Sequence, residues 1–239
     1  MTRLEHCKPR DDGMPEAMRG DVEIWQFDLD CADWDSLAGT LSAEESARAA
    51  RYATETLRAR SRRCRSALRA LLGRRLGRAP RALAFQFNRW GKPALSPHGC
   101  HFNVSHSEGH ALVALSDETI GVDIERVGRA GIDVADLAPM VFHPGELAEW
   151  KDTPHPLRER RFYETWTAKE AYCKARGEGL QIAMPSVRIV GNRVVHDDAP
   201  PVSWFIHVVE VLAEHSANLC MAQPHVRIKH RQAMVEDFL

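Results

Sequence analysis

The sequence predicts an α+β fold made of two similar subdomains. A helical segment at residues 42–79 precedes short strands between residues 82 and 125. A second helical segment at residues 157–176 precedes strands between residues 187 and 222. Both halves therefore follow one order: a helix, a strand with a glycine turn, and a two-stranded hairpin. This internal duplication predicts a pseudo-twofold axis with a cleft between the halves, where ligands are commonly bound.

The elements of the first half are predicted from their boundaries and their periodicity. Ser42 and Glu45 form a capping box, and leucines then recur from Leu57 to Leu76 at helical spacing. A turn at residues 88–93 contains Gly91 and Pro93. Alternating or apolar runs bounded by turn residues predict four strands, at residues 82–87, 101–105, 111–115 and 120–125.

The second half is predicted in the same way. Its helix runs from about Leu157 to Arg176 and ends at Gly177-Glu-Gly179. Three strands are expected, at residues 187–190, 202–212 and 218–222. We therefore divide the chain into an N-terminal subdomain, residues 1–117, and a C-terminal subdomain, residues 118–239.

Composition limits the class of protein and its partners. The 239 residues suffice for one large domain or two small ones, and a net charge of −1 implies no general polyelectrolyte partner. The first residues contain no apolar signal segment, and no apolar run is long enough to span a bilayer. Six cysteines are scattered without a CxxC pair, which is typical of reduced thiols. We expect a cytoplasmic protein without a membrane partner.

Acidic side chains in two separate segments form the strongest chemical pattern. Asp123 and Glu125 are two residues apart, so in a strand both project from one face. Trp166, Glu170 and Lys174 are four apart, so they form one stripe of a helix. Three carboxylates suit a hard cation such as Mg²⁺, which keeps positions for phosphate oxygens and water. A lysine one helical turn away can reach the same phosphate.

Each part of this pattern also has an ordinary structural interpretation. The two strand acids could lie on a solvated face, and Glu170 could form a surface ion pair with the lysine one turn later. Against this, Val122 and Ile124 indicate a strand near the core, where an unpaired carboxylate is unfavourable. Trp166 indicates that its helical stripe faces inward. Lys169 lies on the neighbouring stripe and is expected to be peripheral.

A Ser-His pair marks the end of another predicted strand. Neighbouring residues of a strand face opposite ways, so Ser105 and His106 cannot form a nucleophile–base pair, and the chain has no G-x-S-x-G elbow. Either side chain could bind a phosphate, and a structural role for His106 is the alternative. The histidines and the cysteine within residues 98–110 have neither zincin nor zinc-finger spacing, so zinc is not predicted.

Ten arginines lie between Arg58 and Arg81 without an acidic residue among them. The run admits a solvated basic helix, a nucleic-acid surface, or a site for several phosphates of one ligand. Few aromatic residues interrupt the run, which weakens the case for single-stranded nucleic acid. Lys92 adds a cation after the Trp90-Gly91 turn. We expect no nucleic-acid partner.

Four motifs together resemble those of the 4′-phosphopantetheinyl transferases. The two acidic segments, residues 121–125 and 166–174, match the family's main motifs. Trp90-Gly-Lys-Pro93 and Phe102-Asn-Val-Ser-His-Ser107 match its upstream motifs in the right order. The resemblance covers about residues 40–225. Chain length and internal duplication are similar to the Sfp-type branch, in which one chain forms a pseudodimer.

The resemblance implies a reaction and a role for each acidic residue. Coenzyme A would lie in the cleft, with Mg²⁺ held on its pyrophosphate by Asp123, Glu125 and Glu170. A serine hydroxyl of an apo carrier protein would attack the β-phosphate, take the phosphopantetheine arm and release 3′,5′-ADP. Glu170 is also implied as the base that activates this serine. Lys174 is implied at the leaving pyrophosphate.

The same resemblance implies contacts to coenzyme A and leaves other parts of the chain without a role. It assigns phosphate contacts to Lys92, Ser105 and His106, and the 3′-phosphate to Arg60, with Arg48 and Arg51 nearby. The first forty residues and the basic tail, residues 227–231, match no motif. The surplus arginines are hypothesised to dock acidic carrier proteins.

Two other classes of function compete with this reading. A metal-dependent nuclease or phosphatase would also use three carboxylates and a lysine, but it would explain neither the Ser-His motif nor the duplicated halves. A non-catalytic coenzyme A-binding module would have no need of Glu170. Carriers of fatty-acid, polyketide and nonribosomal peptide synthesis all fit the sequence, as do Mg²⁺ and Mn²⁺. The two halves supply their own cleft, so we expect a monomer.

Overall fold

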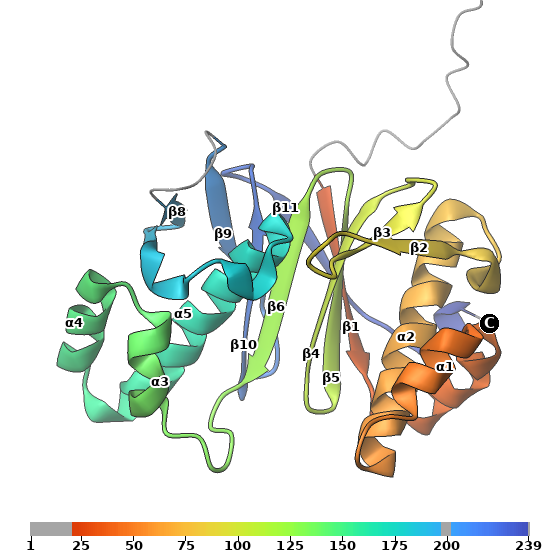
Figure 1. Ribbon diagram of the computed structural model, residues 1–239, viewed down its shortest axis with the longest axis horizontal. Coiled ribbons are helices and arrows are strands. Elements are labelled where there is room, and N and C mark those ends of the chain that lie inside the picture. The colour runs from red at the N-terminus through yellow and green to blue at the C-terminus, as the bar shows by residue number, and fades with distance from the viewer. Residues whose placement is uncertain (1–20, 197–201, 239) are drawn as a thin grey trace, which may run out of the picture.

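The structure is a computed structural model that describes residues 21–196 and 202–238. It has the α+β architecture that the sequence predicts. Figure 1 shows two sheets side by side in the middle of the molecule, with α1 and α2 on one outer side and α3, α4 and α5 on the other. The helices are α1 (Ala43–Ala49), α2 (Glu55–Leu76), α3 (Val134–Val141), α4 (Pro144–Asp152) and α5 (His155–Arg176).

Within the described residues, the strands form a four-stranded sheet, a five-stranded sheet and a separate hairpin. The first sheet has the order β11-β1-β5-β4, the second the order β6-β10-β9-β8-β7, and β2 pairs with β3. The strands of the first half are β1 (Asp21–Asp28), β2 (Ala84–Phe87), β3 (Pro93–Ser96), β4 (His101–Ser107) and β5 (His110–Ser116). Those that follow are β6 (Ile120–Arg126), β7 (Val187–Val190), β8 (Arg193–His196), β9 (Trp204–Val208), β10 (His215–Met221) and β11 (Arg227–Gln232).

The first predicted helix is divided in two. The capping box is confirmed, because Ser42 Oγ accepts a hydrogen bond from the amide of Glu45 and the Glu45 carboxylate accepts one from the amide of Ser42. The single helix expected over residues 42–79 is wrong, since α1 ends at Ala49 and α2 begins at Glu55. Thr54 accepts a hydrogen bond from the amide of Leu57 and so starts a new helix.

The second half contains the helix and the strands that the sequence predicts, whereas α3 and α4 were not predicted. Helix α5 ends at Gly177, whose φ of 71° is the left-handed conformation that favours glycine. The strand expected over residues 202–212 is shorter, Trp204–Val208, and β10 is longer than the strand expected over 218–222. Helix α5 packs on the five-stranded sheet through an apolar cluster that includes Tyr172 and Ile206.

The two halves share an apolar core where their sheets meet. Buried side chains of β1 and β5, such as Ile24 and Leu112, contact buried side chains of β6 and β10, such as Val122 and Leu219. The pseudo-twofold axis stays a prediction, whereas the α+β class is confirmed.

The basic tail returns to the first half of the chain. Strand β11 pairs in parallel with β1, and Val235 packs into the core beneath α2. Ile228 contacts the core between the sheets, so the tail covers an edge of β1 that would otherwise expose unpaired backbone groups. The division after residue 117 stays a prediction, but the tail, although within residues 118–239, lies with the first sheet.

Most arginines of α2 make ion pairs within the chain. Burial alone would raise the pKa of Glu45, but hydrogen bonds from Arg69, the Ser42 backbone and Arg65 outweigh it and lower that pKa to about 2. Five carboxylates thus offset about half of the charge of the ten arginines. The pairs join Arg60 to Asp30, Arg63 to Asp35, Arg65 and Arg69 to Glu45, Arg62 to Glu55 and Arg75 to Asp117.

None of the described helices is long and apolar enough to cross a membrane.

Lys169 is fully buried and not peripheral as expected. Its ammonium lies 2.6 Å from the Glu146 carboxylate. It also donates to the carbonyl oxygens of Val141, Met184 and Val187, at 2.8, 3.1 and 2.6 Å. One side chain of α5 thereby holds the end of α3, the start of α4 and the start of β7. A buried charge is tolerated because every donor of the ammonium can find an acceptor.

Replacing Lys169 by Met should lower the free energy of unfolding by about 3–5 kcal/mol, because the Glu146 carboxylate and three carbonyl groups lose their common partner. Urea denaturation followed by circular dichroism would measure this. Lys151→Met, an exposed position on α4, is the matched control and should change the free energy of unfolding by less than about 0.5 kcal/mol. Equal effects of the two substitutions would contradict a structural role for the buried ammonium.

Candidate active site

A glycine allows α5 to lie directly against β6. A Cβ atom at Gly121 would be 2.1 Å from the carbonyl oxygen of Ala171 and 2.3 Å from the amide nitrogen of Ala175. No other residue fits between the two backbones without moving the helix. Two residues after this contact, Asp123 lies under the turn of α5 that carries Glu170.

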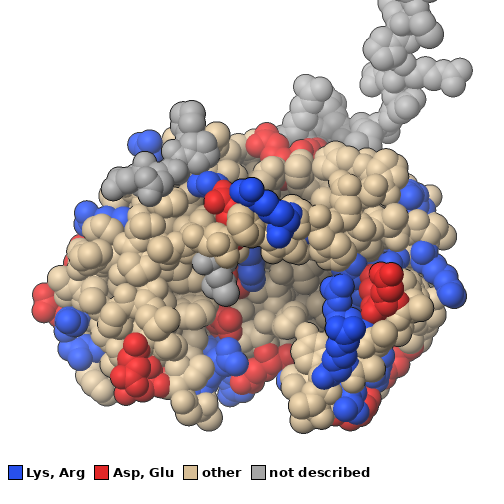
Figure 2. Space-filling view, in the orientation of Figure 1, with Lys and Arg blue, Asp and Glu red and all other residues tan. Residues whose placement is uncertain are grey.

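The close approach creates a small acidic cavity between the two halves. Its volume is about 260 Å³, and it brings together the acids, the lysine and the Ser-His pair identified in the sequence. Figure 2 shows the surface hollowed between the two halves of the molecule. The lining residues are Val104, Ser105, His106, Asp123, Glu125, Trp166, Glu170 and Lys174.

Asp123 lies at the centre of the hydrogen bonds in this cavity. Lys174 Nζ donates to Asp123 Oδ1 at 2.6 Å and to Ser105 Oγ at 2.9 Å, and Ser105 Oγ donates to Asp123 Oδ1 at 2.7 Å. Burial raises the pKa of Asp123, although Lys174 and Ser105 oppose the rise. The second carboxylate oxygen, Oδ2, is buried and accepts no hydrogen bond from the described part of the chain.

The other two carboxyl groups are electrostatically coupled to Asp123. Burial raises the pKa of Glu125, and the charge of Asp123 raises it further. Burial likewise raises the pKa of Glu170, followed by the charge of Asp123 and, after the opposing effect of Lys174, that of Glu125. Crowded carboxylates of this kind are stabilised in the charged form by a cation.

The donor set fits a hard metal ion. In residues 21–196 and 202–238, no three ligating side chains already lie close enough together to hold one. The three carboxyl groups nevertheless line one cavity, and the orphaned oxygen of Asp123 lacks the partner that a buried carboxylate needs. All donors are oxygen atoms, which is the set that Mg²⁺ prefers.

A second cavity of about 380 Å³ adjoins the acidic one, and His106 and Glu125 line both. Arg60 lies in this second cavity, where its guanidinium donates twice to the Asp30 carboxylate, at 2.7 and 2.6 Å. Desolvation and the charge of Lys174 lower the pKa of His106. Arg129 also lines this cavity, and sequence reasoning did not identify it because it lies outside the motifs.

Lys92 lies outside both of these cavities. Its ammonium donates to the carbonyl oxygens of Ile120, at 3.2 Å, and Ala175, at 3.0 Å. It thereby joins the β2–β3 hairpin to β6 and to the end of α5. Burial lowers its pKa to about 8. Its contact with a coenzyme A phosphate stays a prediction.

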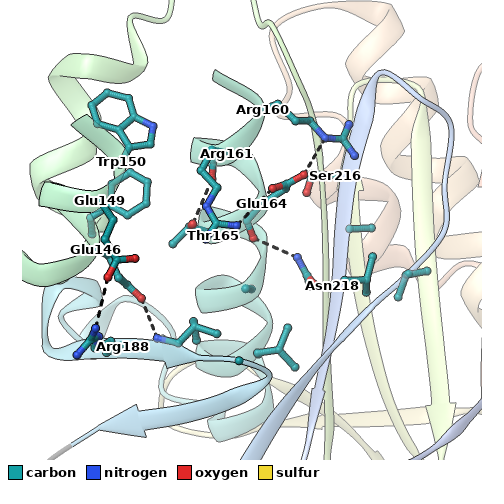
Figure 3. Close-up of a pocket in the computed structure, with 18 of the residues that line it drawn as sticks. Glu146, Glu149, Trp150, Arg160, Arg161, Glu164, Thr165, Arg188, Ser216 and Asn218 are labelled. Carbon is teal, nitrogen blue, oxygen red and sulfur yellow. Dashed lines mark hydrogen bonds and ion pairs between the residues drawn. The ribbon is translucent and has the colours of Figure 1, made fainter. Parts of the chain in front are cut away.

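A larger cavity, of about 1010 Å³, lies in the second half of the chain and shares no lining residue with the acidic cavity. Figure 3 shows its charged side chains on α4, α5 and β7. Arg188 of β7 approaches Glu149 of α4 to 3.5 Å, and Arg160 approaches Glu164 one turn later on α5 to 3.2 Å, so acids and bases pair on its walls. It contains none of the candidate catalytic, metal-ligating or coenzyme A-binding residues that the sequence predicts.

Known proteins match the chain over the region that carries this site. The 4′-phosphopantetheinyl transferase superfamily profile matches residues 119–221. The 4′-phosphopantetheinyl transferase HetI of Nostoc sp. is 36% identical, over 67% of this chain and 70% of its own length. The chain belongs to the 4′-phosphopantetheinyl transferase family. It is accordingly an enzyme of phosphopantetheinyl transfer.

Two further relatives agree with this assignment. The putative 4′-phosphopantetheinyl transferase slr0495 of Synechocystis sp. is 32% identical and covers 82% of both chains. The 4′-phosphopantetheinyl transferase Sfp of Bacillus subtilis is 27% identical, over 59% of this chain and 64% of its own. Family membership favours transfer over nuclease or phosphatase chemistry and over a non-catalytic binding module. The four motifs seen in the sequence are therefore those of a transferase.

Gly121→Ala should lower the free energy of unfolding by at least about 3 kcal/mol, because the new methyl group meets backbone rather than a movable side chain. A displaced α5 should also slow phosphopantetheinyl transfer about 100-fold or more. Denaturation curves and transfer rates would measure both effects. Gly39→Ala is the control, since no heavy atom lies within 4 Å of the position that a Cβ would take there. Wild-type stability and rate in Gly121→Ala would show that α5 does not need this contact.

The lowered pKa of Lys92 predicts a stability that rises with pH. Below pH 8 the buried ammonium is charged in both states, and burial disfavours the folded one. Between about pH 8 and the unfolded value of 10.5, the unfolded chain binds more protons, so stability increases with pH. From pH 7.5 to 9.5 the wild type should gain about 2 kcal/mol relative to Lys92→Met. Parallel urea titrations at both values would test this, and a constant difference would refute it.

Proposed function

We propose that this enzyme transfers the 4′-phosphopantetheine arm of coenzyme A to a serine of an apo carrier protein, releases 3′,5′-ADP and depends on Mg²⁺. The observation that carries the proposal is the convergence of three carboxyl groups and Lys174 on one cavity. That cavity continues into a second one lined by Arg60 and His106. Together they can accommodate a ligand with several phosphates.

Asp123, Glu125 and Glu170 would hold the metal ion. The buried, unpartnered Oδ2 atom of Asp123 supports this set. The pKa values of Glu125 and Glu170 support it too, because burial raises both and the charge of Asp123 raises them further. Bound there with the pyrophosphate, the cation would neutralise negative charge that develops on the phosphate oxygens.

Glu170 is the proposed general base. It comes from α5 and faces the cavity beside the two strand carboxylates. It accepts the proton of the carrier serine, directly or through water, while the serine oxygen forms a bond to the β-phosphorus of coenzyme A. Burial raises the pKa of Glu170 toward the range in which a carboxylate is an efficient base at neutral pH.

Lys174 acts at the opposite end of the reaction. The bond between the β-phosphorus and the bridging oxygen breaks, and that oxygen leaves on 3′,5′-ADP with a negative charge. The Lys174 ammonium lies in the acidic cavity beside Asp123 and Ser105, on a flexible side chain that can turn toward this oxygen. It stabilises or protonates the leaving group.

The adenosine end of coenzyme A is proposed to extend into the second cavity. Arg60 would bind the 3′-phosphate there, and His106 stands between the two cavities. Because the Arg60 guanidinium now pairs with Asp30, the 3′-phosphate competes with that carboxylate for it. Ser105, in the acidic cavity, is a further proposed phosphate contact. Lys92 is another, and its ammonium would have to leave the carbonyl groups of Ile120 and Ala175 to reach a phosphate.

The proposed oligomeric state, carrier class and location follow from the sequence. An Sfp-type chain with two related halves supports a monomer, since the chain supplies both walls of its own cleft. The carrier belongs to fatty-acid, polyketide or nonribosomal peptide synthesis, and a cytoplasmic location agrees with the scattered cysteines.

The proposal predicts that an apo carrier protein incubated with the enzyme, coenzyme A and Mg²⁺ gains the mass of one phosphopantetheine arm. Glu170→Gln should slow this gain about 100- to 10,000-fold, because it removes the base while keeping the size of the side chain. Glu164→Gln, the same change on the same helix but outside the acidic cavity, is the matched control and should retain most of the activity. Mass spectrometry of the carrier measures transfer by the wild type and by both variants.

Two results would overturn the proposal in different ways. No mass gain across carriers of all three pathways would remove the reaction itself. Full transfer by Glu170→Gln, with a wild-type circular dichroism spectrum, would remove Glu170 from its role as base. Cleavage of nucleic acid or a simple phosphoester without coenzyme A would favour the competing hydrolase.

A further inference from the structure

The two halves meet at strands β4 and β6, which are joined by side chains rather than by backbone pairing. Among the described strands, β4 pairs only with β5 and β6 only with β10. Three alternate side chains of β4 nevertheless accept hydrogen bonds from three alternate amides of β6, and we call this set the side-chain ladder. Its bonds run from Val122 N to Asn103 Oδ1 at 2.8 Å, from Ile124 N to Ser105 Oγ at 3.3 Å and from Arg126 N to Ser107 Oγ at 3.0 Å.

The side-chain ladder follows from the geometry of two neighbouring strands. Alternate side chains of a strand share one face, and alternate amides of an edge strand point to one side. Asn103, Ser105 and Ser107 therefore take the place of the carbonyl groups that a neighbouring strand would offer to β6. Without them, three amides at a buried junction would lack acceptors.

Each serine of the ladder also donates a hydrogen bond to a carboxylate of the site, whereas the asparagine does not. A hydroxyl that accepts an amide proton still has its own proton to donate. Ser105 donates to Asp123 at 2.7 Å and Ser107 donates to Glu125 Oε2 at 2.8 Å. The corresponding position opposite Asn103 is Gly121, which has no side chain. Each serine thus connects a carboxylate of the site to the amide that follows it on β6.

Ser107 matters most for the orientation of Glu125. A glutamate side chain has one more rotatable bond than an aspartate and loses more conformational entropy when it is fixed. The other described contact of its carboxylate is Arg129, at 3.4 Å, whose side chain is 45% exposed. Ser107 is itself buried, 4% exposed, and holds Glu125 on the wall shared by the two cavities.

We propose that Ser107 is a positioning residue that holds the Glu125 carboxylate toward the metal position of the acidic cavity. The inference rests on the proposed function, because it takes Glu125 as a ligand. Ser107 also lines the second cavity, but its proposed effect on the metal position acts through the hydrogen bond to Glu125. Partners of this kind orient a ligand and typically contribute about 10- to 100-fold in metal affinity.

The ladder supplies a matched control for a structural role. Ser107→Ala and Asn103→Ala each remove one acceptor for a β6 amide, but only the first removes a hydrogen bond to a carboxylate. Ser107→Thr keeps the hydroxyl on a residue that strands favour. A loss that follows from weakening the junction would affect both alanine variants, whereas positioning affects only Ser107→Ala.

The test measures binding of Mn²⁺, an oxygen-preferring substitute for Mg²⁺, by electron paramagnetic resonance with coenzyme A present and no carrier protein. We expect Ser107→Ala to bind Mn²⁺ about tenfold or more weakly, and Ser107→Thr and Asn103→Ala to bind within about threefold of the wild type. Thermal denaturation should show similar destabilisation of the two alanine variants. If Ser107→Ala does not fold, Ser107→Cys, which is similar in size and hydrogen-bonds weakly, replaces it.

The outcomes separate this inference from the proposed function. Wild-type Mn²⁺ affinity in Ser107→Ala, together with weakened binding in Glu125→Gln, would overturn the role of Ser107 and leave the metal assignment intact. Equal weakening in Asn103→Ala and Ser107→Ala would also overturn it, since the effect would then belong to the junction. Absence of Mn²⁺ binding by the wild type would remove the metal from the proposed function and this inference with it.

Discussion

The contact of two backbones at Gly121 sets the geometry of the entire site. Because no side chain separates β6 from α5 there, the backbones of the strand and the helix are in direct contact. The pleat of β6 turns Asp123 and Glu125 toward the helix, and the helical repeat turns Glu170 and Lys174 back toward the strand. Local periodicity therefore selects which residues face the cavity, and a missing Cβ determines how near they come.

Bringing three carboxyl groups together opposes folding. Burial and mutual repulsion raise the pKa of Glu125 and of Glu170, so ionised carboxylates weaken the folded state at neutral pH. The surrounding structure offsets this through contacts around the cavity. Lys169 holds three elements against α5 on one side of the site, and the side-chain ladder closes the junction on the other. These contacts fix the elements around the site, so the three acidic side chains remain close together.

The features predicted correctly from the sequence are those that depend on neighbouring residues. The capping box at Ser42, the end of α5 at Gly177 and the shared face of Asp123 and Glu125 all follow from local spacing. The features that were missed depend on contacts between distant segments. Nothing within residues 227–231 indicates that they pair with β1, because that choice depends on an open edge at the far end of the chain.

Lys169 shows the same limit at the level of one residue. Its spacing places it beside the acidic stripe, but its four acceptors come from α3, α4, η5 (Met184–Ser186) and β7. A helical wheel describes only the helix to which a residue belongs. The role of a buried lysine is decided by the backbone groups that other elements place around it.

The arginine-rich helix illustrates how tertiary structure changes the meaning of a composition. Ten arginines without an acid in the run suggest a strongly positive surface. In the folded chain, however, Glu45, Asp30 and Asp35 from the preceding segments pair with four of these arginines. Such pairs orient the guanidinium groups and reduce the field that an acidic carrier would meet. Arg60 combines a structural ion pair with a proposed ligand contact, because it pairs with Asp30 and also lines the second cavity. A ligand that binds there must replace the two hydrogen bonds that the Asp30 carboxylate provides, and a phosphate monoester can do so with two of its oxygens while carrying more negative charge than a carboxylate.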